Sequence, residues 1–408
     1  MKRALVLTYD YPPCSAPGAA LRSAKLVQYL PEFGWAARVI CRLEPGPAHA
    51  EALRAGAPEV IRVGPVTPER ISYQLASWTW AKRMYPRAAA VIREWSPDLI
   101  YVSCPPFAHA LPAVRLARDA GLPVVVDFRD AWSLDPYADG GWIKHAAKRA
   151  LCRWVIPPLE RKAIAAADAV LTNTPSMHRA YIRAYPDARA RIHLVPNGFD
   201  ETDFGDTREP PPRDRPQLLY CGRFAGVGGR SPDILLQGVR AALDAGRRFD
   251  LAILGDDSPA LRDAVQRAGL QPSVRQRGLV PHHEAIDAMR HADILVVCQA
   301  PGRNDVTAVA GKTFEYLRSG RPILAIVPPG DNADLVRRHA AVHAIVTDED
   351  PSRVAAAIGD LLDRASRVNA GMAPDPAFVA EYSRRHIAGR IAAVFDAAGN
   401  VPAADAGA

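Results

Sequence analysis

Cysteine, lysine and long apolar runs are all scarce in this sequence of 408 residues. It contains six cysteines, and none forms a C-x-x-C pair or lies near a histidine at metal-ligand spacing. This spacing argues against a zinc ribbon or a disulfide framework and favours reduced thiols. No apolar run reaches the roughly 18 to 20 residues that a membrane-spanning helix needs. We therefore expect a soluble, cytoplasmic, globular protein.

The N-terminus lacks the apolar core of a signal peptide. After Lys2 and Arg3, the apolar run covers only Ala4 to Leu7 and ends at the sequence Tyr-Asp-Tyr-Pro-Pro. Such a run is too short for a signal peptide and has the length of a buried β-strand. We therefore predict that the chain begins with a strand.

Basic charge is supplied almost entirely by arginine, which accounts for 44 of the 51 basic side chains. Residues 1–200 carry a net charge of +9, and residues 201–408 carry −2. A basic first half suits an anionic partner, such as a phospholipid surface or a phosphorylated acceptor. The alternative is that the arginines reflect only the overall amino-acid composition of the protein and lie on solvated surfaces without an anionic partner. We expect no nucleic-acid partner.

Short apolar runs alternate with longer amphipathic ones along most of the chain. This pattern predicts parallel βαβ units with helices on both faces of the sheet. The alternation stops at 197–217, which is rich in Pro, Asp, Arg and Gly. We therefore expect two doubly wound α/β domains, whose ligands bind at the carboxyl ends of the strands in the cleft between the domains. The predicted parts are a first Rossmann-like domain over 1–205, a linker over 206–216, a second Rossmann-like domain over 217–375, a helix over 376–397 that packs back toward the first domain, and a disordered tail over 398–408.

The tripeptide Gly311-Lys312-Thr313 is one that ends many phosphate-binding loops. A Walker A loop would need glycine at position 306, where Val306 stands, and it would follow the first strand of its domain. The segment therefore argues against a P-loop hydrolase. It does predict a loop that runs into a helix, and the N-terminus of that helix can bind a diphosphate. Lys312 can add positive charge there.

Several stretches, taken in this order, carry a family pattern from Tyr9 to about Asp396. They are "YDYPPCSAPGAALRSAKLVQYLPEFGW", "VVVDFRDAW", "ERKAIAAADAVLTNTPS", "VPNGFDETDF", "YCGRF", "GLVPHHEAIDAMRHADILVV" and "GKTFEYLRSGRPILA". The sequence resembles the retaining glycosyltransferases of family 4, which have the GT-B fold, and in particular a subset with a G-K-x-F-E-Y-L motif. The resemblance implies transfer of a sugar from a nucleoside-diphosphate donor, without an essential metal.

The resemblance also assigns donor-binding roles in the second domain. Glu315 stands where the family binds the ribose hydroxyls, and Arg223 stands where it binds the diphosphate. Thr307 replaces a family glutamate that contacts the transferred sugar, so the place of a carboxylate is taken by a hydroxyl. The family often has a lysine where Gly229 stands, and the neighbouring Arg230 is either its substitute or a solvated loop cation. Other residues expected around the donor are Gly255, Asp256, Leu279 and Val280, which would frame the nucleobase, and Gly311 at the start of the helix.

In the first domain, the loop after the first strand matches a glycine-rich family loop, of which Gly18 remains, followed by Arg22. We expect both to face the donor, although the stretch is also compatible with an ordinary Pro-rich turn. Arg129 and Asp130 follow a buried strand, after Asp127, and are predicted catalytic residues unless the adjacent charges simply pair with each other. His109 is a candidate on the acceptor side, or else a structural histidine.

Acidic and histidine pairs elsewhere do not predict a metal site. The Asp-Glu-Asp sequence at 348–350 precedes Pro351 and Ser352, where acids commonly cap a helix. His282 and His283 are adjacent, so both are poorly placed to ligate one ion. No pair of carboxylates typical of glycosidases stands out.

The sequence thus predicts a glycosyltransferase of surface polysaccharide, glycolipid or secondary-metabolite synthesis. A non-catalytic nucleotide-sugar-binding protein and a nucleotide-sugar epimerase on the same fold remain alternatives. The acceptor is either a small molecule or a lipid-linked molecule. For the latter, residues 142–162 combine an apolar stripe, two tryptophans and several cations, which suits peripheral contact with an anionic inner membrane face. The alternative is that the stripe packs on the domain's own core.

Overall fold

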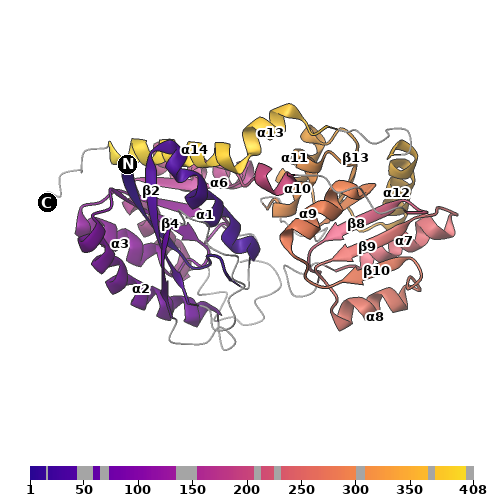
Figure 1. The fold of residues 1–408 in the computed structure, drawn as a ribbon, viewed down its shortest axis with the longest axis horizontal. Coiled ribbons are helices and arrows are strands. Elements are labelled where there is room, and N and C mark those ends of the chain that lie inside the picture. The colour runs from indigo at the N-terminus through magenta and orange to yellow at the C-terminus, as the bar shows by residue number, and fades with distance from the viewer. Residues whose placement is uncertain are drawn as a thin grey trace. The chain divides into compact units, whose positions relative to one another are not determined.

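The computed structural model divides the chain into two compact units (Figure 1). The N-terminal unit comprises Met1–Asn197 and Arg384–Ala408, and the C-terminal unit comprises Gly198–Ser383. Each unit is built around one parallel sheet. The structure describes residues 1–14, 17–43, 58–64, 73–134, 154–205, 213–224, 231–299, 308–365 and 373–400.

The strands of the N-terminal unit are short apolar runs, and the central ones are buried along their whole length. Burial on both faces explains the near-continuous apolar sequence of β4 and β5. All pairings are parallel, in the order β3-β2-β1-β4-β5-β6-β7. The strands are β1 (Lys2–Thr8), β2 (Trp35–Arg42), β3 (Glu59–Val63), β4 (Leu99–Cys104), β5 (Val124–Phe128), β6 (Ala169–Thr172) and β7 (Ile192–Leu194).

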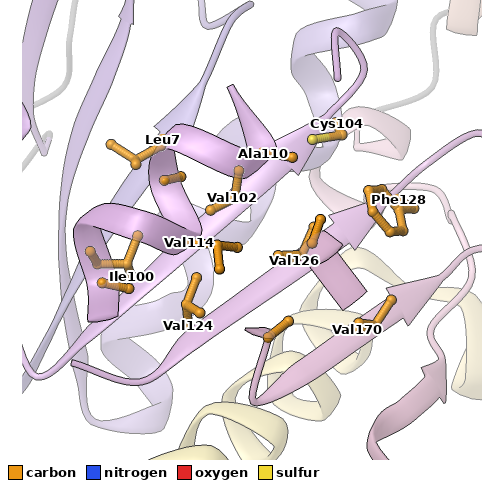
Figure 2. Close-up of a cluster of buried hydrophobic side chains, with 14 of the residues drawn as sticks. Leu7, Ile100, Val102, Cys104, Ala110, Val114, Val124, Val126, Phe128 and Val170 are labelled. Carbon is orange, nitrogen blue, oxygen red and sulfur yellow. The ribbon is translucent and has the colours of Figure 1, made fainter. Parts of the chain in front are cut away.

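Helices cover both faces of this sheet. Side chains of α2, α3, α5 and α6 share one buried cluster with the sheet, part of which is shown in Figure 2, and those of α1 and α14 share the other. Thr174 begins α6 by accepting a hydrogen bond from the Met177 amide, and Gly121, at φ 65°, ends α3. The helices are α1 (Pro17–Tyr29), α2 (Tyr73–Trp95), α3 (Ala110–Ala120), α5 (Ile156–Ala166), α6 (Pro175–Ala184) and α14 (Arg384–Gly399), with 3-10 helices η1 (Leu30–Phe33) and η4 (Pro186–Arg191).

The C-terminal unit repeats this plan with the strand order β10-β9-β8-β11-β12-β13. Helices α7, α8 and α12 cover one face, and α9, α10, α11 and α13 cover the other. The strands are β8 (Gln217–Cys221), β9 (Asp250–Leu254), β10 (Val274–Arg277), β11 (Ile294–Cys298), β12 (Ile323–Ile326) and β13 (His343–Val346). The helices are η5 (Glu201–Phe204), α7 (Asp233–Asp244), α8 (Pro259–Arg267), α9 (His282–His291), α10 (Gly311–Ser319), α11 (Asp331–His339), α12 (Pro351–Ala365) and α13 (Pro376–Tyr382).

The boundary between the units differs from the one expected from sequence. The N-terminal unit ends at Asn197, before the Pro-rich stretch. The single helix expected over 376–397 is two helices, because Ser383 has an extended backbone and forms a parallel β-bridge with Phe199. As a result α13 belongs to the C-terminal unit, and α14 belongs to the N-terminal unit.

The structure also resolves questions about cysteines and membrane spans within the described residues. Five cysteines lie there, and all five are free thiols. Over the same part of the chain, no helix is both long enough and apolar enough to cross a bilayer.

Candidate functional site

Two glycines directly follow strands β8 and β9 in the C-terminal unit. Gly222 follows β8 at φ 138°, and Gly255 follows β9 at φ 99°. Both values lie where only glycine is comfortable. The turns also pack closely, because a Cβ on Gly255 would lie 3.4 Å from backbone atoms of Gly222. A Cβ on Gly222 would in turn lie 3.0 Å from Nζ of Lys312, so glycine lets the two turns and the lysine pack closely at the edge where ligands of parallel sheets commonly bind.

Lys312 reaches this edge from the start of α10. Its Nζ donates to the carbonyl oxygen of Cys221 at 2.7 Å and lies 3.7 Å from the ring centroid of Tyr220. The Tyr220 hydroxyl in turn donates to the carbonyl of Arg223 at 3.3 Å, and the Arg223 side chain is exposed. The structure therefore brings the two predicted phosphate-binding cations to the same short stretch of backbone.

The N-terminus of α10 has no side-chain cap. Its N-cap residue is Ala310, which cannot accept a hydrogen bond through its side chain, and no acidic residue lies in the first turn. The position facing Gly311 is open, since a Cβ there would meet nothing within 4 Å. The Tyr316 hydroxyl accepts the Cys221 amide at 2.9 Å and fixes α10 beside β8. An anion at this helix end would meet backbone N–H groups and the positive end of the helix dipole.

Glu315 lies one turn further along α10, and its side chain is 16% exposed. Its Oε1 lies 3.5 Å from Nε2 of His282, which also lies 3.3 Å from Oδ2 of Asp203. Sequence reasoning considered His282 only as a metal ligand and missed this contact. No sequence signal could have revealed it, because the three residues come from separate elements.

The carboxylate of Asp256 accepts hydrogen bonds from backbone amides of the neighbouring loops. It is 5% exposed, and its oxygens accept the amides of Phe224 at 2.8 Å and Ser258 at 3.0 Å. The prediction that Asp256 helps to frame the nucleobase therefore depends on its backbone rather than on its carboxylate. Leu279 is the opposite case, with 72% of its surface exposed, while Val280 is half-buried.

Arg22 is an interior residue of the N-terminal unit, which contradicts its predicted place at the donor. Its guanidinium makes a two-pronged ion pair with the fully buried Asp127, at 2.6 and 3.1 Å. It also donates to the carbonyls of Pro196 and Val195 at 2.7 and 3.0 Å. Burial opposes the charge, but Asp127 and the Tyr101 hydroxyl outweigh it, so the pKa of Arg22 is raised. Asp127 is therefore also unavailable to a ligand.

His109 is likewise buried completely and does not reach the surface on the acceptor side. Its Nε2 lies 3.1 Å from the carbonyl of Ser103, and its ring meets Trp80 edge-on at 5.1 Å. Burial lowers the pKa of His109 to about 4, so the imidazole is neutral near pH 7. The side chain has the surroundings of a core residue.

Arg129 and Asp130 lie at the end of β5, as expected, but Arg129 points back at the backbone. Its Nη2 donates to the carbonyl of Pro105 at 2.8 Å, and its Nε donates to that of Cys104 at 3.2 Å. Asp130 is exposed. Arg129 thus joins the ends of β4 and β5, and Asp130 remains accessible.

Three further predictions can be placed only in part. Gly18 lies in the first turn of α1. Arg230 and Thr307 lie outside the described residues, as do positions 142–153 of the predicted membrane segment. The acidic stretch at 348–350 is described, and there Asp350 accepts the Ser352 amide at 2.9 Å at the start of α12. Hydrogen bonds from Ser352 lower the pKa of Asp350. Among the described residues, no group of three His, Cys, Asp or Glu side chains has the geometry of a metal site.

Comparison with known families agrees with the division of the chain into two α/β units. Residues 17–198 match the family described as "Glycosyl transferase 4-like domain", and residues 215–364 match "Glycosyl transferases group 1". The chain belongs to the GT-B glycosyltransferases. The two matches cover the N-terminal and C-terminal sheets of this glycosyltransferase in turn, which confirms the predicted fold class and enzyme class.

Two curated relatives share moderate identity with this glycosyltransferase. D-inositol 3-phosphate glycosyltransferase 1 of Catenulispora acidiphila is 29% identical over 52% of this chain and 53% of its own length. 2-Deoxystreptamine N-acetyl-D-glucosaminyltransferase of Streptomyces fradiae is 27% identical over 70% of this chain and 72% of its own. The chain therefore spans about half the length of the first relative.

A solved structure extends the similarity over the whole fold. Anabaena HepE, solved in complex with UDP-glucose, superimposes with a TM-score of 0.67 over 97% of this chain and all of that chain, at 16% identity. At such identity the comparison supports the fold alone.

Proposed function

We propose that this protein transfers a sugar from a nucleoside-diphosphate donor to an acceptor hydroxyl or amine, with retention at the anomeric carbon and without an essential metal. The observation that carries the proposal is the cationic edge of the C-terminal unit. There Arg223 is exposed, Lys312 lies against the Cys221 carbonyl, and the N-terminus of α10 has no side-chain cap.

Departure of a nucleoside diphosphate places negative charge on the leaving phosphate. Charge that develops in the transition state is best stabilised by groups already in position, since they need not reorganise during the reaction. In this proposal Arg223 binds the phosphates with its guanidinium fork, and α10 provides backbone amides. Lys312 is held by a carbonyl oxygen and an aromatic ring, and from there it can turn to the phosphate.

Retention requires the acceptor to attack the face from which the diphosphate leaves. We propose that the leaving phosphate oxygen takes the acceptor proton, so that the proton moves from the attacking group to the departing group as the new glycosidic bond forms. Glu315 binds the ribose and takes no part in this proton transfer. Thr307, in place of the family's first acid, provides a hydroxyl near the sugar.

The acceptor class that we favour is a small cyclitol. The names of both curated relatives contain a cyclitol, inositol 3-phosphate in one and 2-deoxystreptamine in the other. The donor class that we favour is a UDP-sugar, because HepE was solved in complex with UDP-glucose. Both choices rest on similarity and are open to direct measurement.

Product analysis tests the proposal. Purified protein is incubated with UDP-, GDP- or dTDP-sugars, with and without a cyclitol panel, and the products are identified by mass spectrometry and NMR. A glycosylated cyclitol with the donor's anomeric configuration, formed equally well in EDTA, is the expected result. Donor binding without turnover would identify a binding protein, and an isomerised donor sugar would identify an epimerase.

A lipid-linked acceptor remains the second candidate because of α5 and the residues just before it. Trp154, two residues before α5, is 71% exposed, and Arg161 and Lys162 are exposed within the helix. An exposed indole beside cations suits an anionic headgroup zone. Glu160, however, is buried and accepts a hydrogen bond from Tyr185 at 2.9 Å, so it does not oppose these cations at the surface. Co-sedimentation with anionic vesicles at low salt tests this candidate, and a protein that stays in the supernatant contradicts it.

A further inference from the structure

A single imidazole nitrogen in the C-terminal unit faces carboxylates from two other elements. His282 is the first residue of α9, and its Nε2 lies 3.3 Å from Oδ2 of Asp203 and 3.5 Å from Oε1 of Glu315. Asp203 belongs to η5, and Glu315 belongs to α10. Ionised carboxylates only accept hydrogen bonds, so Nε2 carries the proton when it hydrogen-bonds Asp203. Glu315 lies at ion-pair distance from the same nitrogen, so His282 contacts two other elements through one imidazole nitrogen.

The two other charged groups of α10 near Glu315 are the basic side chains Arg318 and Lys312, and each contacts another group. Arg318 makes a two-pronged ion pair with Glu201, with contacts of 2.7 and 2.9 Å, and its guanidinium lies 4.9 Å from the ring centroid of Phe204. Lys312 is directed to the Cys221 carbonyl. On α9 itself, Glu284 pairs with Arg277 at 3.2 Å.

The adjacent histidine gives a natural comparison. His283 is also exposed and follows His282 in the first turn of α9. Successive residues on a helix point about 100° apart, so the two imidazoles do not share one direction. A substitution at 283 therefore changes the same residue type on the same helical turn without touching the contact to Glu315.

We infer that His282 is a positioning residue for Glu315, which it orients for binding the ribose of the nucleotide donor. This inference rests on the proposed function, in which Glu315 accepts hydrogen bonds from the ribose hydroxyls. Nε2 of His282 lies beside Oε1 of Glu315, and this contact favours one rotamer of the glutamate. His282 also supplies a proton between two carboxylates that otherwise repel each other across a short distance.

The role predicts a specific division between kinetic constants. His282 contacts neither the diphosphate nor the reacting carbon, so its loss changes donor binding and KM and leaves kcat nearly unchanged. A partly exposed ion-pair contact of this kind corresponds to about a three- to tenfold change in Kd at most. His282→Phe keeps the ring and removes the donor nitrogen. His282→Gln keeps an N–H donor near the position of Nε2 and should restore most of the binding.

The test is a double-mutant cycle between positions 282 and 315. UDP, GDP, ADP and dTDP are titrated into the wild-type protein by calorimetry, and the nucleotide that binds most tightly is used for the variants. These are His282→Phe, His282→Gln, Glu315→Ala and the double variant with phenylalanine at 282 and alanine at 315, together with the control His283→Phe. Thermal unfolding of each variant shows whether the fold is intact.

We expect His282→Phe to weaken binding about three- to tenfold in the wild-type background and to have no further effect beside Glu315→Ala. His282→Gln and His283→Phe should bind within about twofold of wild type. If His282→Phe does not weaken binding while Glu315→Ala does, or if it weakens binding equally in both backgrounds, the inference fails and the proposed function stands. If Glu315→Ala has no effect or no nucleotide binds, the proposed role of Glu315 fails and the inference falls with it.

Discussion

Replacing Arg22 distinguishes a structural arginine from a donor-binding one. The guanidinium is 3% exposed and donates to both oxygens of Asp127, which is itself completely buried. Arg22→Ala removes this partner and leaves a buried carboxylate without its opposite charge. It also removes the donors to the carbonyls of Val195 and Pro196. Breaking a buried pair from one side costs about 3–5 kcal/mol, so we expect a loss of that size in the unfolding free energy of the N-terminal unit.

The measurement is urea unfolding followed by circular dichroism and tryptophan fluorescence. Because the chain has two units, two transitions can occur, and only the one that shifts in Arg22→Ala is analysed. Arg115→Ala is the control, since Arg115 lies on α3 of the same unit with its side chain 72% exposed. It should change the unfolding free energy by less than about 0.5 kcal/mol. A double variant, Arg22→Met with Asp127→Leu, should be more stable than Arg22→Ala because it leaves no buried charge.

The result that would refute this reasoning is equally specific. If Arg22→Ala unfolds within about 1 kcal/mol of wild type and instead raises the donor KM strongly, the guanidinium binds the donor. The buried ion pair would then not describe the protein in solution. If unfolding is strongly affected and the nucleotide affinity of the folded fraction is unchanged, the structural role is confirmed.

Three further predictions concern the C-terminal unit and the core histidine. Arg223→Ala should lower kcat/KM by about 30- to 1,000-fold, the equivalent of roughly 2–4 kcal/mol of transition-state stabilisation, and a loss below about threefold would place the diphosphate elsewhere. Glu315→Ala should raise the donor KM with the fold intact, and unchanged donor kinetics in a folded variant would remove Glu315 from the site. Burial lowers the pKa of His109 to about 4. Between about pH 6.5 and pH 4 this histidine is therefore protonated in the unfolded chain and neutral in the folded chain. The unfolding free energy should therefore fall as the pH drops through this range, by at most about 3 kcal/mol from this residue, and His109→Gln should show a smaller fall in urea unfolding at the same pH values.

The sequence by itself determined the fold class, and it also predicted a place for the site. Runs such as Leu99–Cys104 and Val124–Phe128 are apolar throughout because both faces of a parallel strand are buried, and this can be read without coordinates. The Gly-Lys-Thr tripeptide also indicated a helix start at Gly311, and α10 begins at that residue. Local patterns suffice in these cases because each depends on neighbouring residues.

Other elements were missed because their local signals are weak. The 23-residue helix α2 was not predicted, and it has Pro86 within it. The strand β10 has the sequence Val-Arg-Gln-Arg and lies at the edge of its sheet, where polar side chains are tolerated. Both elements are stabilised by packing against a neighbouring strand or helix. The local sequence does not show that such a partner is available.

Only the tertiary structure decided what the polar side chains do. Arg22 and His109 stand next to loops in the sequence, yet both are buried, Arg22 because Asp127 can neutralise it and His109 because a neutral imidazole can be buried beside Trp80. His282, Asp203 and Glu315 meet although they are far apart in the chain. A contact between distant residues depends on how whole elements pack, and hydrogen-bond partners are chosen at that stage. Residue type and spacing therefore predicted a phosphate-binding edge, and only the folded chain decided which charged side chains are exposed and which are buried.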